Sequence, residues 1–144
     1  MAAGANLLVS EAMRSELLQR AKFVLSEAKG TVLFRRDDAV RGLFLIRRGR
    51  VSVAQDTGSV EYPPRILGPG AVVGLPATVA GSAYKLTAEV VDQAELAFVP
   101  RTEMLSCLQH NVELCFEVMT LLSGEISGTH AALKRTGSGR EPAA

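Results

Sequence analysis

The chain has 144 residues, of which 47% are hydrophobic and 22% are charged, and its formal net charge is +1. This length fits one domain that can bury roughly two-thirds of its unfolded surface without disulfides or metals. The small net charge excludes a strong overall attraction to nucleic acid or anionic lipid. No apolar run approaches the ~20 residues that cross a bilayer, and the N-terminus has no basic n-region or long h-region, so we expect a cytoplasmic protein without membrane contact.

The composition also argues against common catalytic and metal sites. Cys107 and Cys115 are too few to form a zinc or iron–sulfur site alone, and we interpret both as small buried hydrophobic residues in helices. No nucleophile elbow, Walker loop, metal triad or pair of catalytic carboxylates is recognisable. We therefore expect a protein that is not an enzyme and has no cofactor, while a small-molecule effector stays open.

The first predicted element is an amphipathic helix from Ser10 to Ala28, preceded by a flexible N-terminus over residues 1–9. Its apolar residues recur three and four positions apart, which is the helical period. They are Met13, Leu17, Ala21, Val24 and Ala28. Ser10 is suited to cap this helix, and Lys29 with Gly30 supplies the cation and glycine that commonly close one.

From residue 31 the apolar period changes to two, which predicts β-strands. The candidate strands are residues 31–35, 43–48, 51–55, 65–67, 71–73, 86–91 and 95–99. Gly42 starts the second candidate, Gly49 ends it, and turn formers such as Gly68-Pro69-Gly70 separate later ones. Many short strands at close spacing predict an antiparallel barrel or sandwich.

After Pro100 the period returns to 3.6, which predicts a short helix over residues 102–109 and a long helix over residues 112–134. The long helix carries a narrow heptad seam, which we call the predicted seam. Its members are Val112, Cys115, Met119, Leu122, Ile126, Thr129 and Leu133. The seam could pack on the chain's own barrel, but six turns exceed what one barrel covers, so we favour a homodimer through this helix. Residues 135–144 have no hydrophobic period and are expected to be disordered.

Arginines cluster around the first predicted hairpin. They are Arg35, Arg36, Arg41, Arg47, Arg48 and Arg50. The cluster could be a patch for nucleic acid, a phosphorylated ligand or an acidic partner, or it could be a solvated face with local ion pairs. We favour the solvated face, because the interleaved aromatic residues Phe34 and Phe44 alternate toward the core.

The order of these elements and the residues between them resemble the sensor domain of the Crp/Fnr family, the cyclic-nucleotide-binding β-roll. The matching segments are KGTVLFRRDD, RGLFLIRRGRVSV, ILGPGAVVG and TAEVVDQAELAFVPRTEML. The resemblance implies a mainly β fold with flanking helices, a jelly-roll-like antiparallel roll with its N-terminal helix over residues 10–111, and a dimerisation helix over residues 112–134. Each motif alone is weak, but four in this order are fairly specific for the fold.

The resemblance also places a phosphate-holding loop at Gly74. In the family, a glutamate after this glycine binds the ribose and an arginine about ten residues on pairs with the cyclic phosphate. Here Leu75 takes the glutamate position, and an alignment ambiguous by one residue puts Tyr84 or Lys85 at the arginine position. Losing both charged contacts costs on the order of 3 to 6 kcal/mol, or two to four decades of affinity. We therefore expect no binding of cyclic AMP or cyclic GMP at physiological concentrations.

Two interpretations of the loop stay open: it is closed by its own small apolar residues, or it is remodelled for a less polar or differently shaped effector. The candidate ligand-binding residues are Gly74, Leu75, Pro76, Ala77, Thr78, Tyr84, Lys85 and Thr129. Thr129 is included because a polar residue near this point of the family's long helix touches the base bound by the partner chain. The alternative function is a genuine receptor for a cyclic nucleotide or another anionic effector, acting through Lys85, Tyr84, Thr78 and the backbone around Gly74.

The family usually carries a DNA-reading winged helix after the long helix. This sequence ends eleven residues after Leu133, so we expect no direct DNA binding by the chain as given. We expect a regulatory module in transcriptional regulation that acts through dimerisation, or through pairing with a full-length Crp/Fnr-like regulator.

Overall fold

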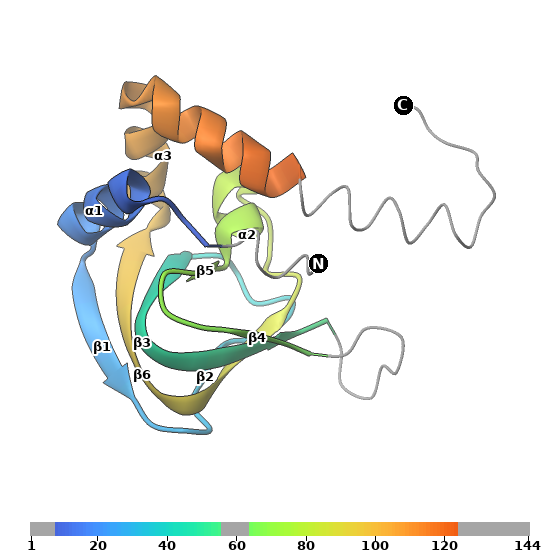
Figure 1. Ribbon diagram of the computed structural model, residues 1–144. Coiled ribbons are helices and arrows are strands. Elements are labelled where there is room, and N and C mark those ends of the chain that lie inside the picture. The colour runs from blue at the N-terminus through green and yellow to red at the C-terminus, as the bar shows by residue number, and fades with distance from the viewer. Residues whose placement is uncertain (1–7, 56–63, 124–144) are drawn as a thin grey trace.

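Two long strands organise the fold of this chain, whose computed structural model describes residues 8–55 and 64–123. Strand β3 (Gly42–Ala54) and strand β6 (Thr87–Pro100) pair antiparallel over nearly their whole lengths. Both are strongly curved, and together they wrap into a roll (Figure 1). The mainly β class with flanking helices is thereby confirmed.

Short strands extend this pair in both halves of the roll. Strand β1 (Phe23–Glu27) pairs with the C-terminal half of β6, and β2 (Val32–Phe34) pairs with its N-terminal half. Strand β5 (Val72–Val73) pairs with the first half of β3, and β4 (Arg65–Leu67) pairs with its second half. All of these pairings are antiparallel, as the sequence predicts.

The helices gather at one end of the roll (Figure 1). Helix α1 (Glu11–Arg20) precedes the strands, α2 (Leu75–Ala80) follows β5, and α3 (Arg101–His110) follows β6. A further helix over residues 112–123, which we call the last helix, follows α3 directly. The predicted short helix over residues 102–109 is confirmed as α3.

Alternation along β3 divides the buried residues into two cores. Phe44 and Ile46 belong to the core inside the roll, whereas Leu43 and Leu45 belong to a second core between the sheet and the helices. The side-chain period of two sends neighbouring residues to opposite faces, so one strand supplies both cores. The second core includes Met13 of α1, and the sheet therefore fixes the position of the helices.

The predicted helix from Ser10 to Ala28 is too long. Ser10 caps it as expected, because its Oγ accepts a hydrogen bond from the Met13 N–H at 3.1 Å. The helix ends at Arg20, however, and residues 23–27 form β1, in which Phe23 lies opposite Phe98 of β6. Phe23, Val24 and Leu25 form a short apolar run that periodicity alone cannot assign to a helix or a strand, so the pairing with β6 decides the conformation.

Two further boundaries also differ from those predicted. Gly30 does not close a helix; it has φ of 94° in the turn between β1 and β2. The strand candidates 43–48 and 51–55 form one strand, β3, and the candidates 86–91 and 95–99 form β6. Residues that resemble breaks in the sequence are bulges here, because the register between β3 and β6 shifts on both sides of Gly49.

A hydrogen-bonded pair ties α1 to the last helix. The backbone N–H of Ser10 donates to Glu117 Oε2 at 2.7 Å, and the Ser10 hydroxyl donates to Glu117 Oε1 at 2.6 Å. Residues 107 positions apart in the chain are thus joined at the helical end of the roll. The last helix therefore docks on its own roll along one face.

Candidate ligand-binding and partner sites

The predicted phosphate-holding loop is the turn from β5 into α2. Gly74 has φ of 89°, and a Cβ placed there would lie 3.2 Å from Cε1 of Tyr84 and 3.4 Å from the Gly42 carbonyl oxygen. This position therefore suits glycine for both its backbone conformation and its close packing. Pro76 lies in the first turn of α2, where its missing N–H costs no helical hydrogen bond.

The side chains of the next loop residues pack inside the chain. Leu75 is only 2% exposed and lies in the core between the sheet and the helices, whereas Ala77 lies in the core inside the roll. Thr78 is fully buried, and its hydroxyl donates to the Gly74 carbonyl oxygen at 2.7 Å. The loop side chains that could have faced a ligand are therefore engaged within the chain.

Tyr84 points into the roll rather than toward solvent. Its hydroxyl donates to the Gly42 carbonyl oxygen at 2.6 Å and accepts from the backbone N–H groups of Arg41 and Gly42 at 3.2 and 3.3 Å. Its ring stacks on Phe34 with the ring centroids 3.8 Å apart. Tyr84 thus fills the space beside Gly74 with a neutral ring whose polar atom is already satisfied.

Lys85, next to Tyr84 in the chain, is exposed. Among the residues that the structure describes, it has no ion-pair partner. The cation that does contact α2 is Arg101, whose Nε donates to the Thr78 carbonyl oxygen at 2.9 Å. That contact lies toward the C-terminal end of α2, where a helix attracts cations, and not at the end that would hold an anion.

Of the described seam residues, Leu122 packs at the edge of the core under the helices, whereas the seam as a whole is not the face that docks on the roll. The face that does is formed by Leu114, Val118 and Leu121, all buried. Val112 and Met119 are 68% and 55% exposed, and Cys115 and Leu122 are half-buried. The seam residues Ile126, Thr129 and Leu133 lie outside the described residues.

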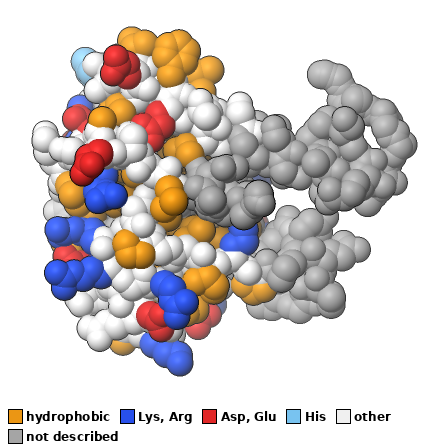
Figure 2. All heavy atoms as spheres, viewed as in Figure 1, with side chains coloured by type: hydrophobic (Ala, Val, Ile, Leu, Met, Phe, Trp, Pro, Cys, Tyr) orange, Lys and Arg blue, Asp and Glu red, His pale blue; other side chains and the backbone are white. Residues whose placement is uncertain are grey.

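Phe116 was missed by the sequence analysis and belongs beside the exposed seam residues. It is 63% exposed, and its spacing of four from Val112 and three from Met119 places the three side chains along one side of the helix. We call these three residues the apolar stripe. Figure 2 shows hydrophobic side chains gathered on the surface over the helical end of the molecule. A strict heptad pattern excluded Phe116, although a wider stripe would have included it.

Three arginines of the cluster, Arg47, Arg48 and Arg50, pair with carboxylates of β6. Arg47 contacts Glu95 at 2.7 Å, and Arg50 bonds Asp92 on the neighbouring strand β6. Figure 2 shows cationic and anionic side chains side by side over the roll. The preferred interpretation, a solvated face with local ion pairs, is confirmed for these residues.

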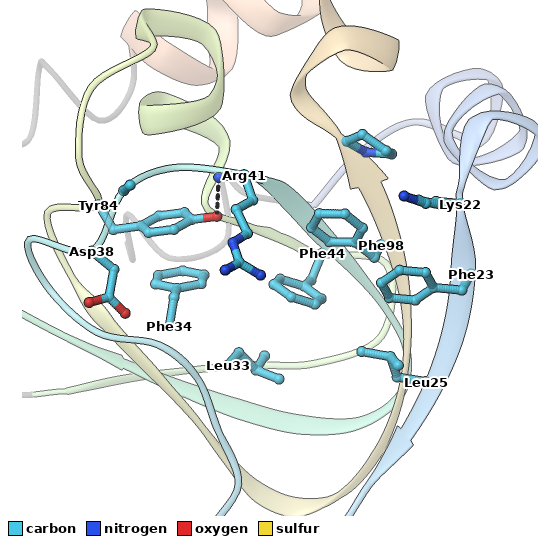
Figure 3. Close-up of a pocket in the computed structure, with 12 residues that line it drawn as sticks. Lys22, Phe23, Leu25, Leu33, Phe34, Asp38, Arg41, Phe44, Tyr84 and Phe98 are labelled. Carbon is cyan, nitrogen blue, oxygen red and sulfur yellow. Dashed lines mark hydrogen bonds between the residues drawn. The ribbon is translucent and has the colours of Figure 1, made fainter.

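Aromatic residues from distant segments surround a cavity that the sequence analysis did not anticipate (Figure 3). The cavity has a volume of about 810 Å³ and lies between the sheet formed by β1, β6 and β3 and the segment that joins β2 to β3. Phe23, Phe34, Phe44, Tyr84 and Phe98 line it. Their alternation predicted core positions for Phe34 and Phe44, but alternation cannot show that an opening remains between two faces of a roll.

The two side chains whose pKa values are shifted, Cys107 and Arg20, lie away from these sites. Burial raises the pKa of the Cys107 thiol between the helices and the sheet, and a hydrogen bond from Arg20 to Glu16 raises the pKa of that guanidinium. Cys107 is buried as predicted, whereas Cys115 is only half-buried. Across residues 8–55 and 64–123, no group of His, Cys, Asp and Glu side chains could hold a metal ion, and no helix is long and apolar enough to span a bilayer.

The sequence over residues 25–111 matches the family model of the cyclic nucleotide-binding domain. The chain belongs to this family. No curated protein is significantly similar to it in sequence.

Solved structures agree with this cyclic nucleotide-binding domain fold. The catabolite activator protein of Thermus thermophilus superposes with a TM-score of 0.75 at 18% identity, over 89% of this chain and 60% of that one. A transcriptional regulator from Thermotoga maritima superposes with a TM-score of 0.74 at 13% identity, over 88% of this chain and 98% of that one. The identities are low, so these likenesses show the fold alone, which confirms the β-roll.

The same domain fold also occurs within an enzyme. An EAL enzyme in its cAMP-bound form superposes with a TM-score of 0.59 at 20% identity, over 79% of this chain and 31% of that one. The expectation that this chain is not an enzyme therefore stays a prediction.

Proposed function

We propose that this chain is a regulatory module of the Crp/Fnr type that does not bind cyclic AMP or cyclic GMP at physiological concentrations. The observation that carries the proposal is the position of Tyr84. Its ring packs beside Gly74, and its hydroxyl is fully used by the backbone of residues 41 and 42. Tyr84 therefore offers no guanidinium to a cyclic phosphate at the start of α2.

The position of Leu75 supports the same conclusion. A carboxylate at this position could accept a ribose hydroxyl, but the leucine side chain lies among Leu43 and Val72 under the helices. Two charge-assisted hydrogen bonds are missing, at about 1.5–3 kcal/mol each. Binding weakened by that amount falls outside the range in which a signalling nucleotide acts.

Isothermal titration calorimetry with cyclic AMP and cyclic GMP tests this proposal. We expect no binding heat up to millimolar nucleotide, for the native chain and for Lys85→Ala alike. A micromolar dissociation constant would refute the proposal. If that binding were lost in Lys85→Ala, the alternative function, a receptor for an anionic effector, would replace it.

We further propose that the chain acts as a homodimer joined through the apolar stripe of the last helix. Val112, Phe116 and Met119 are more than half exposed, while the opposite face of the helix is buried on the roll. Exposed apolar side chains that adjoin one another on a helix mark a partner surface. A second copy offers the same stripe, so two-fold pairing would bury it on both chains.

Light scattering of the purified chain with and without Met119→Glu tests the dimer. We expect the native mass to be that of a dimer and the variant to be a monomer, because a buried unpaired carboxylate opposes the pairing. Thr120→Glu adds the same charge at the exposed neighbouring position and should leave the dimer intact. A monomeric native chain would contradict the proposal.

The proposed setting is transcriptional regulation in the cytoplasm. The chain spans 60% of the length of the Thermus thermophilus catabolite activator protein, and we propose no sequence-specific DNA contact by the described residues themselves. As the alternative partner of the stripe we propose a longer relative that carries a winged helix. Co-purification of such a protein, lost in Met119→Glu and kept in Thr120→Glu, would support that pairing.

A further inference from the structure

The aromatic cavity is a chamber inside one end of the roll. Its volume of about 810 Å³ falls within the range of small-molecule sites in proteins. The residues that line it are Lys22, Phe23, Leu25, Leu33, Phe34, Asp38, Ala39, Arg41, Phe44, Tyr84, Phe98 and Pro100. Residues 74–78 are not among them, but Phe34 and Tyr84, which pack against Gly74, are, so the cavity lies next to the phosphate-loop position.

A continuous row of aromatic rings forms one wall of the cavity (Figure 3). Phe23, Phe98 and Phe44 are cross-strand neighbours on β1, β6 and β3, and successive ring centroids are 5.1 Å apart. The row continues from Phe44 to Phe34 at 6.2 Å and from Phe34 to Tyr84 at 3.8 Å. Five of the chain's seven Phe and Tyr residues thus line one chamber.

Aromatic side chains that border open space make fewer van der Waals contacts than side chains packed in a core. Protein interiors are normally filled to crystal-like density, and rings that border a gap lose dispersion contacts. Phe23 is 43% exposed, and Leu25 and Leu33 are half-buried, although all three belong to the cavity lining. A planar apolar ring would cover these side chains and restore the lost contacts.

The cavity also carries two cations. Lys22 and Arg41 line it, and among the described residues neither side chain has an ion-pair partner. Figure 3 shows the Arg41 side chain directed toward the chamber. The one carboxylate in the lining, Asp38, accepts a hydrogen bond from the Arg35 backbone N–H at 3.0 Å and so stabilises its own turn. The charge left for a ligand is therefore positive.

We propose that this cavity binds a small planar aromatic acid, with its ring against the aromatic wall and its carboxylate toward Lys22 and Arg41. A cyclic nucleotide fits less well, because its ribose hydroxyls would face phenyl rings that offer them no hydrogen bonds. The inference goes beyond the proposed function, since the ligand is held by the aromatic wall and two cations and not by residues 74–78 or the apolar stripe.

Calorimetric titration with 2-naphthoate tests the proposal. We expect saturable binding, weakened about tenfold or more for neutral 2-naphthamide, which lacks the charge, and for cyclohexane carboxylate, which lacks the flat ring. Absence of 2-naphthoate binding at millimolar concentration would overturn the proposal. Equal affinity for all three compounds would overturn it as well.

Variants at exposed positions locate the site without disturbing the fold. Phe23→Ala should weaken 2-naphthoate binding about fivefold to tenfold, whereas Val24→Ala, on the other face of the same strand, should leave it unchanged. The double variant Lys22→Ala, Arg41→Ala should weaken binding about tenfold, and Lys29→Ala, which removes a cation outside the cavity, should not. Affinity that falls in Met119→Glu instead would place the ligand on the last helix and refute the cavity.

The two proposals fail in different ways. Cyclic AMP that binds without displacing 2-naphthoate would refute the proposed function and leave the aromatic site standing. Loss of 2-naphthoate binding in Val24→Ala and Phe23→Ala alike would refute the aromatic site and leave the proposed function unaffected.

Discussion

Tyr84 connects the phosphate-loop position with the aromatic cavity. Its ring is shared between the two, since it packs against Gly74 and lines the cavity together with Phe34, which also lies close to Gly74. Its hydroxyl holds the backbone at Gly42, where β3 begins. A charged side chain at position 84 would therefore have to leave the interior, because a cation cannot be buried beside Phe34 without a partner.

Replacing Tyr84 with phenylalanine should destabilise the fold by about 1–3 kcal/mol, because the Gly42 carbonyl oxygen and two N–H groups lose a buried partner. The ring itself and its stacking on Phe34 are kept. Denaturant unfolding measures the difference, with Lys85→Ala as an exposed control that should stay within about 0.5 kcal/mol of the native chain. An unchanged midpoint for Tyr84→Phe would show that water satisfies Gly42.

Strand β3 shows how one element can serve both cores and both halves of the roll. Its continuity across Gly49 depends on a residue with φ of 84° and no side chain. A Cβ at that position would lie 2.2 Å from the Gln93 carbonyl oxygen of β6. The bulge therefore bends the strand while keeping it paired, so the roll closes without a break.

Gly49→Ala should consequently cost about 2–4 kcal/mol, because both the backbone conformation and the contact with β6 become unfavourable. Gly68→Ala is a matched control, since a Cβ at Gly68 would meet nothing within 4 Å. Thermal and denaturant unfolding of the two variants measure the contrast. Equal stability of both would mean that β3 is interrupted at Gly49, as the sequence pattern first indicated.

For the whole molecule, the helical end is held together by contacts between distant parts of the chain. Ser10 bonds Glu117, and Leu121 of the last helix lies in the same core as Met13 of α1. This docking determines which side of the last helix is exposed. The apolar stripe faces outward because Leu114, Val118 and Leu121 face the roll.

Glu117→Ala should lower the unfolding free energy by about 0.5–1.5 kcal/mol, because Ser10 loses both hydrogen bonds to the carboxylate. The loss should be local, and hydrogen exchange should quicken in α1 more than in the strands. Glu113→Ala removes a carboxylate from the same helix at an exposed position and serves as the control. Unchanged exchange in α1 would mean that apolar packing alone holds the two helices together.

The sequence determined the succession of a helix, a run of strands and two further helices, the alternation of Leu43 and Leu45 against Phe44 and Ile46, and the Ser10 cap, because these depend on local periods and on neighbouring backbone groups. It also indicated that Leu75, unlike a carboxylate, cannot accept a hydrogen bond from a ribose hydroxyl. All of these features can be identified from residues close together in the chain.

Only the tertiary structure decided the features that depend on distant neighbours. Helix α1 stops at Arg20 because β6 offers backbone partners to residues 23–27. Tyr84 points inward because Gly42 receives its hydroxyl, and five aromatic rings meet because four strands and one loop bring them together. Such contacts join residues tens of positions apart, so the spacing of apolar residues within one segment cannot predict them.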